Sequence, residues 1–164
     1  MVNNLDSTYT EISQNLSKGD LDELASAGAA FKGESSKDVI DVANKSKEKL
    51  SQLRVVPLTL ENLKEHPITK TLSDKDLKKF IDIQENGYGS GKPDDLGANA
   101  LVIGDVPVMF IVMKNFSHLT PRRQLAVFAH EVSHLVGGVH TDENPSRPLD
   151  NSDQWETYIE FRKP

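Results

Sequence analysis

The chain contains no cysteine among its 164 residues. Neither a disulfide framework nor a thiolate metal site can form, so any metal must be held by nitrogen and oxygen ligands. Aromatic residues make up only 6% of the chain, and the apolar residues concentrate between Leu53 and Phe161. We therefore expect the main folded core in that part of the chain, which is long enough for one domain.

Membrane and export signals are missing as well. No apolar run approaches the roughly 20 residues of a membrane helix, and residues 1–16 lack the basic start and apolar stretch of a secretory signal. We expect a soluble chain that is cytoplasmic as synthesised, so any export would use a specialised route. The net charge is -6 with no long basic run, which argues against a nucleic-acid partner and suits a cationic substrate better.

The most informative segment that is present is His130-Glu131-Val132-Ser133-His134. Two histidines four positions apart lie on one face of a helix, so both imidazoles can reach a single zinc ion (Zn2+) at roughly 2.0 to 2.1 Å. The glutamate between them can act as the general base toward water. The pattern predicts a metal hydrolase, and the alternative is an ordinary pair of helical histidines.

The remaining signals indicate an α+β protein that is mainly helical. Three helices over about 6–16, 20–31 and 36–53 predict a helical N-terminal arm or linker over 1–53, followed by a metal-binding domain over 54–164. Short helices are expected over 59–65 and 73–85, and the apolar runs 100–103 and 108–113 predict a β-hairpin beside the metal helix. The strand of the second run could bind an extended peptide along its edge, or simply be sheet core.

Two further helices carry the expected site. Thr120-Pro121 begins the metal helix, and Gly137-Gly138 stops it after about Val136. A final helix over about 151–161 should pack on it through core residues, namely Trp155, Tyr158, Ile159 and Phe161.

A third zinc ligand must come from beyond the pentapeptide, because catalytic zinc generally takes three protein ligands. His140 completes the longer pattern His-Glu-x-x-His-x-x-Gly-x-x-His of the metzincins, whose site also needs a downstream methionine. All three methionines lie upstream, at 1, 109 and 113. A glutamate of the last helix would instead give a gluzincin-like site. The full set of candidates is His140, Asp142, Glu143, Asp153, Glu156 and Glu160.

A longer stretch resembles the aspzincin metallopeptidases, the deuterolysin and peptidyl-lysine metalloendopeptidase group that also occurs as toxin domains of exported bacterial proteins. The segment from Phe110 to His134 is similar to that group's strand, Phe-containing turn and metal helix, and Asn151-Ser152-Asp153-Gln154-Trp155-Glu156 is similar to its Asn-Ala-Asp segment. The resemblance covers about residues 100–162 and implies a zincin-like fold. It also implies an aspartate as third ligand, which places Asp142 in that role, with His140 as the alternative.

The family's Gly-Thr-x-Asp-x-x-Tyr-Gly segment is replaced here by residues 138–145. Its tyrosine, which stabilises the oxyanion, has no aligned equivalent, so Tyr158 or Tyr88 are the candidates for that role. In lysine-specific members an acidic pair lines the substrate pocket, and Asp153 with Glu156 stands at the matching places. The alternative is an ordinary acidic helix start.

The resemblance implies a zinc-dependent metalloendopeptidase with Glu131 as general base, acting on a protein or peptide as an exported effector or toxin with lysine preference. An immunity or inhibitor protein would then be a partner, no membrane partner is expected, and we expect a monomer. Two other classes remain open: a metal-stabilised binding module without turnover, and a zinc amidase acting on cell wall.

Overall fold

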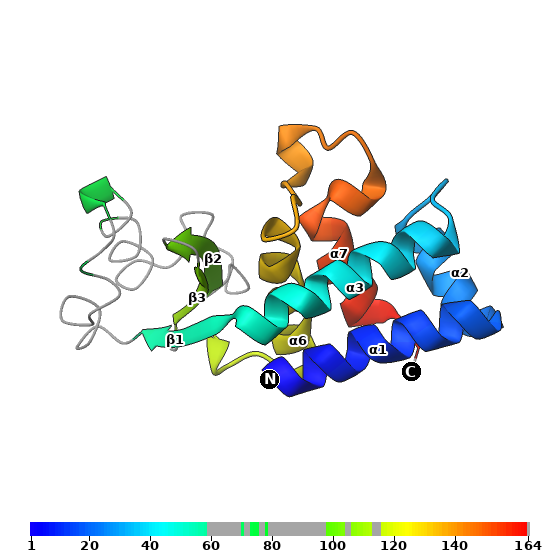
Figure 1. Ribbon diagram of the computed structural model, residues 1–164, viewed down its shortest axis with the longest axis horizontal. Helices are drawn as coiled ribbons and strands as arrows, with labels where there is room; N and C mark the ends of the chain where they lie inside the picture. Colours follow the sequence, from blue (N-terminus) through cyan, green and yellow to red (C-terminus); the bar gives the residue numbers. More distant parts are fainter. Residues whose placement is uncertain are drawn as a thin grey trace. The chain divides into compact units, whose positions relative to one another are not determined.

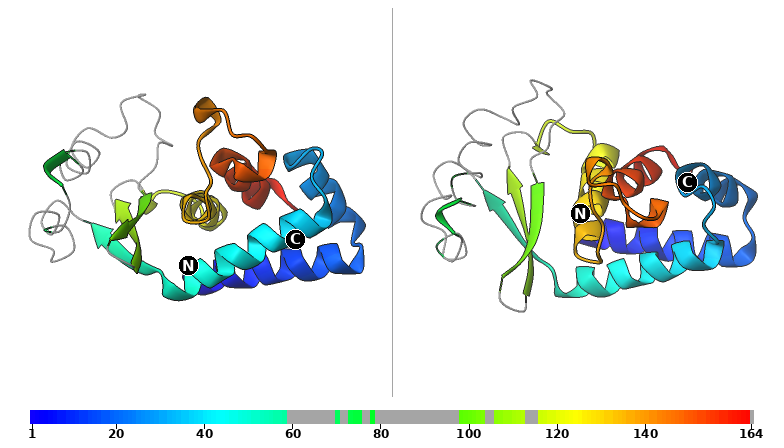
Figure 2. Two further views of the ribbon diagram at one scale, coloured as in Figure 1. Left: turned by 45° about the horizontal axis from the view of Figure 1, so that its top comes forward. Right: turned by 90° about the horizontal axis from the view of Figure 1, so that it is seen from above.

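The computed structural model describes residues 1–58, 70, 73–75, 78, 98–103, 106–112 and 116–163. The chain forms two compact units, one made of residues 1–53 with 121–164 and the other of residues 54–120 (Figures 1 and 2). This grouping differs from the expected division after residue 53. The N-terminal helices join the unit that contains the metal helix, because their apolar faces pack against helices near the C-terminus.

Three helices build the N-terminal part of the first unit: α1 (Val2–Lys18), α2 (Leu21–Ala30) and α3 (Ser36–Gln52). They confirm the three helices predicted for residues 1–53. Asp20 and Ser35 cap α2 and α3, since each side chain accepts a hydrogen bond from the backbone N–H three residues on. Gly19 ends α1 in the left-handed conformation with φ 75°. The helix α1 packs against α3 through its buried face, formed by Leu5, Tyr9, Ile12 and Leu16.

The C-terminal part of the first unit contains α6 (Pro121–His134) and α7 (Ser152–Phe161), with short 3-10 turns η2 (Thr141–Glu143) and η3 (Pro148–Asp150) between them. Both predicted helices are confirmed, although α6 ends two residues earlier than expected. The side-chain oxygen of Asn151 caps α7 by accepting from the backbone N–H groups of Asp153 and Gln154. α7 packs against α6 and also against α2.

Trp155 of α7 lies at the centre of this core, where it is fully buried. Its ring centroid lies 4.7 Å from that of Phe31 and 6.0 Å from that of Tyr9, and its indole N–H donates to the carbonyl of Leu149 at 3.0 Å. The prediction of Phe161 as a core residue was wrong, because its side chain is 73% exposed. Phe161 follows Trp155 by six residues, about 240° around the helix, and therefore points outward.

The second unit contains a three-stranded sheet of β1 (Arg54–Leu58), β2 (Ala98–Ile103) and β3 (Val106–Val112), in the order β1-β3-β2. The antiparallel pairing of β2 with β3 confirms the predicted hairpin, and β1 adds a parallel pairing on the other side of β3. Because β3 is the middle strand, it has no open edge to which a peptide could add. The helix expected over 59–65, most of that over 73–85, and Tyr88 lie outside the described residues.

The α+β class is confirmed by these two units. Among the described helices, none combines the length and the apolar character needed to cross a membrane.

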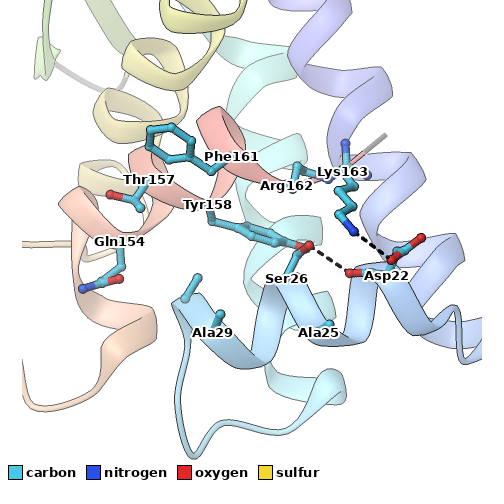
Figure 3. Close-up of a pocket in the computed structure, with 11 residues that line it drawn as sticks. Asp22, Ala25, Ser26, Ala29, Gln154, Thr157, Tyr158, Phe161, Arg162 and Lys163 are labelled. Carbon is cyan, nitrogen blue, oxygen red and sulfur yellow. Dashed lines mark hydrogen bonds and ion pairs between the residues drawn. The ribbon is translucent and has the colours of Figure 1, made fainter.

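A buried ion pair joins Glu23 of α2 to Arg162, the residue that follows α7. Figure 3 shows Tyr158 and Arg162, which both contact Glu23, beside α2. Arg162 donates to Oε1 of Glu23 from Nε at 3.1 Å, and the hydroxyl of Tyr158 donates to the same oxygen at 2.5 Å. Burial raises the pKa of Glu23, but the hydrogen bonds from Arg162 and Tyr158 and the charge of Arg162 outweigh it and hold that pKa below its ordinary value. Glu23 is therefore ionised in the folded protein, and this contribution to stability is lost only as the pH falls through its lowered pKa.

We expect Glu23→Gln to lower the free energy of unfolding by about 3 kcal/mol, because it leaves the guanidinium charge of Arg162 buried without its main partner. Urea unfolding at pH 7 measures this loss, which should shrink as the pH falls below about 4.5, the ordinary pKa of this carboxyl.

Asp22→Asn is the matched control for this variant. Asp22 pairs with Lys163 at 3.5 Å across the same two helices, but both side chains are at least 70% exposed. Its loss should therefore cost less than about 1 kcal/mol. Equal losses in the two variants would show that burial of the Glu23 pair does not matter.

Candidate metal centre

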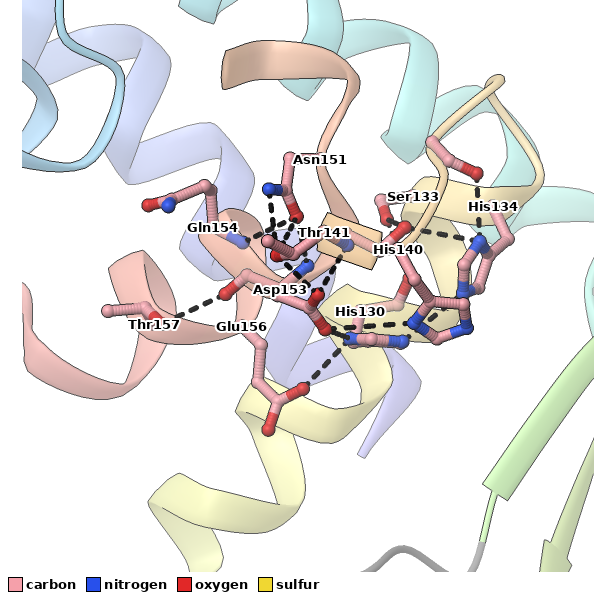
Figure 4. Close-up of polar contacts among 12 residues, drawn as sticks. His130, Ser133, His134, His140, Thr141, Asn151, Asp153, Gln154, Glu156 and Thr157 are labelled. Carbon is pink, nitrogen blue, oxygen red and sulfur yellow. Dashed lines mark hydrogen bonds and ion pairs between the residues drawn. The ribbon is translucent and has the colours of Figure 1, made fainter. Parts of the chain in front are cut away.

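The two histidines of the pentapeptide lie one turn apart on α6, with His130 buried and His134 half-buried (Figure 4). Their Nε2 atoms are 3.2 Å apart. Two nitrogen ligands on one tetrahedral zinc ion, each at roughly 2.0 to 2.1 Å from it, are separated by about 3.3 Å. The separation of the two nitrogens therefore fits a shared metal ion.

The other ring nitrogen of His134 faces groups that require it to carry a proton. Its Nδ1 lies 2.8 Å from the carbonyl oxygen of Gly138, which can only accept, and 3.1 Å from the hydroxyl of Ser152. Burial lowers the pKa of His134, and the charges of His130 and His140 lower it further despite the opposing contact with Gly138. His134 is therefore held neutral, with its Nε2 lone pair directed toward His130.

The Nδ1 atom of His130 faces two carboxylates. Oε2 of Glu156 lies 2.8 Å away and Oδ1 of Asp153 lies 3.5 Å away, although the contact with Glu156 lacks the alignment of a straight hydrogen bond. Burial lowers the pKa of His130, but Glu156, helped by the charges of Glu131 and Asp153, outweighs burial and raises it. The negative charge on this side keeps a proton on Nδ1.

With a proton on each Nδ1, the two Nε2 lone pairs would face one another at 3.2 Å. Such an arrangement is repulsive unless a cation lies between the two nitrogens. A proton on one Nε2 satisfies this condition in the metal-free protein, and a metal ion bound to both satisfies it by displacing that proton. The donor set is thus suited to a metal that prefers imidazole ligands, such as zinc.

His140 completes a group of three histidines. Its ring centroid lies 4.9 Å from that of His130 and 4.7 Å from that of His134, and one nitrogen of each ring lies within 4.8 Å of the other two. Backbone hydrogen bonds place it: Val139 donates to the carbonyl of Asp150 and accepts from Ser152, both at 2.9 Å. The side chain of His140 is 49% exposed, so the centre opens toward solvent on this side.

Asp142, the expected third ligand, does not join this group. It is exposed in η2, and among the described residues it belongs to no set of three closely spaced ligand groups. Side chains two positions apart in a tight 3-10 turn point in different directions, so a turn that directs His140 toward α6 directs Asp142 elsewhere. Of the other candidates, Glu143 binds the backbone N–H of His140 at 3.1 Å, and Glu160 pairs with Arg123 at 2.6 Å.

The proposed lysine-pocket residues, Asp153 and Glu156, contact the histidines instead. Asp153 accepts from the backbone N–H and the hydroxyl of Thr141 at 2.8 and 2.7 Å, which holds the loop that carries His140. Glu156 is buried, and its second oxygen lies 2.5 Å from Arg123. Both carboxylates therefore already have partners within the protein, with Glu156 buried and the Asp153 side chain 41% exposed.

Tyr158 was expected to act at the centre, but the structure places its hydroxyl against Glu23. It follows Glu156 by two residues, about 200° around α7, so the two side chains leave nearly opposite faces of the helix. Glu131, the predicted general base, is only 5% exposed and lies on α6 directly after His130.

Sequence reasoning missed Gly138 and Ser152, which face Nδ1 of His134, and Ser133, which donates to Ser152. The hydroxyls of the two serines lie 2.6 Å apart beside the glycine. A Cβ atom at Gly138 would lie 2.7 Å from Oγ of Ser152 and 2.8 Å from Oγ of Ser133. The second glycine after the pentapeptide was the available signal, because one glycine is enough to end a helix.

No family model, curated protein or solved structure matches the chain. The resemblance to the aspzincins therefore stays a prediction.

We expect Gly138→Ala to lower the free energy of unfolding by about 1 to 3 kcal/mol, because its Cβ would overpack the site between the two serines. It should also weaken metal binding, since the carbonyl of Gly138 orients His134. Gly28→Ala is the control: it lies inside α2 with open space around it, and should stabilise by roughly 0.5 to 1 kcal/mol. Urea unfolding of both variants checks this, and a Gly138→Ala protein as stable as wild type would contradict the close packing.

Proposed function

We propose that the chain is a zinc-dependent hydrolase that cleaves peptide bonds, with His130, His134 and His140 as metal ligands and Glu131 as general base. The observation that carries the proposal is the pair of Nε2 atoms 3.2 Å apart, with acceptor groups facing both Nδ1 atoms. This arrangement is what two histidines need in order to share a metal ion. A zincin-like fold belongs to the proposal, but the chemistry does not require it.

When bound, zinc supplies a Lewis acid that activates water near neutral pH and polarises a carbonyl group. Glu131 follows the first ligand directly on α6, and we assign its carboxylate the role of taking a proton from the attacking water. The same group can return that proton to the leaving amine. The exposed side of His140 is the side from which solvent, and hence a substrate, can approach.

The choice of peptide bonds rests on the combination of the pentapeptide with a helix that is regular through both histidines. A lysine preference is not included, since Asp153 and Glu156 already have partners within the protein. An exported effector role, with an immunity or inhibitor protein as partner, is compatible with this chemistry and remains part of the proposal.

We expect His140→Ala to lower zinc affinity by more than about 100-fold, beyond what losing an outer hydrogen-bond partner typically costs. Asp142→Ala should leave it unchanged, because Asp142 lies outside the histidine group. Competition with a chromophoric chelator measures both affinities. The reverse result, loss in Asp142→Ala alone, would establish the aspartate-completed site that the aspzincin resemblance implies.

We expect Glu131→Gln to retain zinc but to lose about 100-fold to 10,000-fold in hydrolysis rate, the usual contribution of a general base. A fluorogenic peptide library and a panel of unfolded proteins serve as substrates, with purified cell wall as a parallel assay. Cleavage of cell wall alone would identify an amidase.

The binding-module alternative predicts a different pattern. In that case no substrate would be turned over, Glu131→Gln would change nothing measurable, and His130→Ala would lower only the melting temperature. Wild-type protein that binds no zinc at all would exclude every one of these functions.

A further inference from the structure

We propose that Glu156 is a positioning residue for the metal centre, and that Arg123 holds it in this role. The three side chains Arg123, Glu156 and His130 form a chain of contacts that we call the relay. The inference rests on the proposed metal site and explains how that site keeps its geometry.

The two oxygens of Glu156 have different partners. Oε1 lies 2.5 Å from Nη2 of Arg123, and Oε2 lies 2.8 Å from Nδ1 of His130. Both partners belong to α6, seven residues or about two turns apart, whereas Glu156 belongs to α7. One carboxylate of α7 therefore contacts α6 at two points along the same face (Figure 4 shows the contact with His130).

The contact with His130 determines where the ligating nitrogen points. A carboxylate behind a metal-binding histidine fixes the orientation and tautomer of the ring and strengthens its remaining nitrogen as a donor. Here the carboxylate holds the Nδ1 side, which leaves Nε2 directed at the Nε2 of His134. The partner of His134 is a neutral carbonyl, so only His130 has an anionic group of this kind facing its Nδ1 among the contacts described for these two rings.

Arg123 explains why Glu156 supports the site instead of ligating the metal. Glu156 and Asp153 come close enough to His130 to form a second three-residue group, but both approach it from the Nδ1 side. An ion in that group would have to displace the Nδ1 proton and compete with the guanidinium of Arg123. The salt bridge to Arg123 thus favours a charge-compensating role for Glu156 outside the ligand set.

Glu160 provides a matched control for the relay. It lies one turn beyond Glu156 on α7 and pairs with the same arginine at 2.6 Å. Its described contacts reach Arg123 and not His130. Glu160→Gln therefore removes one carboxylate charge from α7 beside Arg123, as Glu156→Gln does, but it does not change any contact described for the imidazole of His130.

The test measures zinc affinity by chelator competition for wild type, Glu156→Gln, Glu156→Ala and Glu160→Gln. We expect Glu156→Ala to lose about 10-fold to 100-fold in affinity, as is typical when the partner of a ligating histidine is removed. Glu156→Gln should lose less, because its amide oxygen can still face Nδ1 although the charge is gone. Glu160→Gln should bind zinc as wild type does.

A second readout separates this role from simple structural support. The visible absorption of the cobalt-loaded protein reports the ligand field at the metal, and it should shift in Glu156→Gln but not in Glu160→Gln. Melting temperatures of the metal-free variants show whether each protein is folded. Should Glu156→Ala not fold, the isosteric Glu156→Gln carries the comparison with Glu160→Gln alone.

The outcomes distinguish this inference from the proposed function. Equal zinc affinities and cobalt spectra in Glu156→Gln and Glu160→Gln would overturn the relay, while continued peptide hydrolysis would leave the proposed function standing. A loss in Glu156→Ala as large as that in His140→Ala, with a change in coordination number, would make Glu156 a ligand and also overturn the relay. Wild-type protein without zinc affinity would remove the proposed function and the relay together.

Discussion

The packing of α7 between α6 and the N-terminal helices is the constraint on which the candidate metal centre depends. One face of α7 buries Trp155 and Tyr158 against α1, α2 and the residue that follows α2. The opposite face presents Asp153 and Glu156 to the histidines of α6. A shift of α7 that changed the packing of one face would also move the side chains on the other face. Residues 1–53 therefore contribute to the geometry of the centre without supplying any of its groups.

Most of the helices and the hairpin could be predicted because their signals are local. Caps such as Asp20 and Ser35, and stops such as Gly19, act on backbone groups within a few residues. The hairpin was also predictable, because its two strands are close neighbours in the sequence. The parallel strand β1 was not predicted, because it lies about fifty residues before β3 and no pattern in its own sequence indicates with which strand it pairs.

The juxtaposition of His130 and His134 in the candidate site was predictable, because helical periodicity alone decides it. The position of His140 depends instead on the isolated β-bridge between Val139 and Asn151. No local sequence pattern predicts this contact. Tyr158 was wrongly expected at the candidate metal centre for a similar reason. Its direction depends on which face of α7 points toward the N-terminal helices, and that face is shown only by the buried contacts of Glu23 with Tyr158 and with Arg162, which is 139 positions away. The grouping of residues 1–53 with α6 and α7 rests on the same long-range contacts.

The placement of negative charge outside the three histidines has a consequence for what the candidate centre would bind. Three neutral imidazoles would leave the full double charge on a zinc ion, whereas an aspartate ligand would cancel half of it. Glu156 and Asp153 lie behind His130 instead, and they attract either cation that can occupy the space between the two Nε2 atoms. They raise the pKa of His130 and so favour the competing proton. At equal distance, however, a carboxylate attracts a double charge twice as strongly as a single one, so the same groups favour the metal more than they favour the proton.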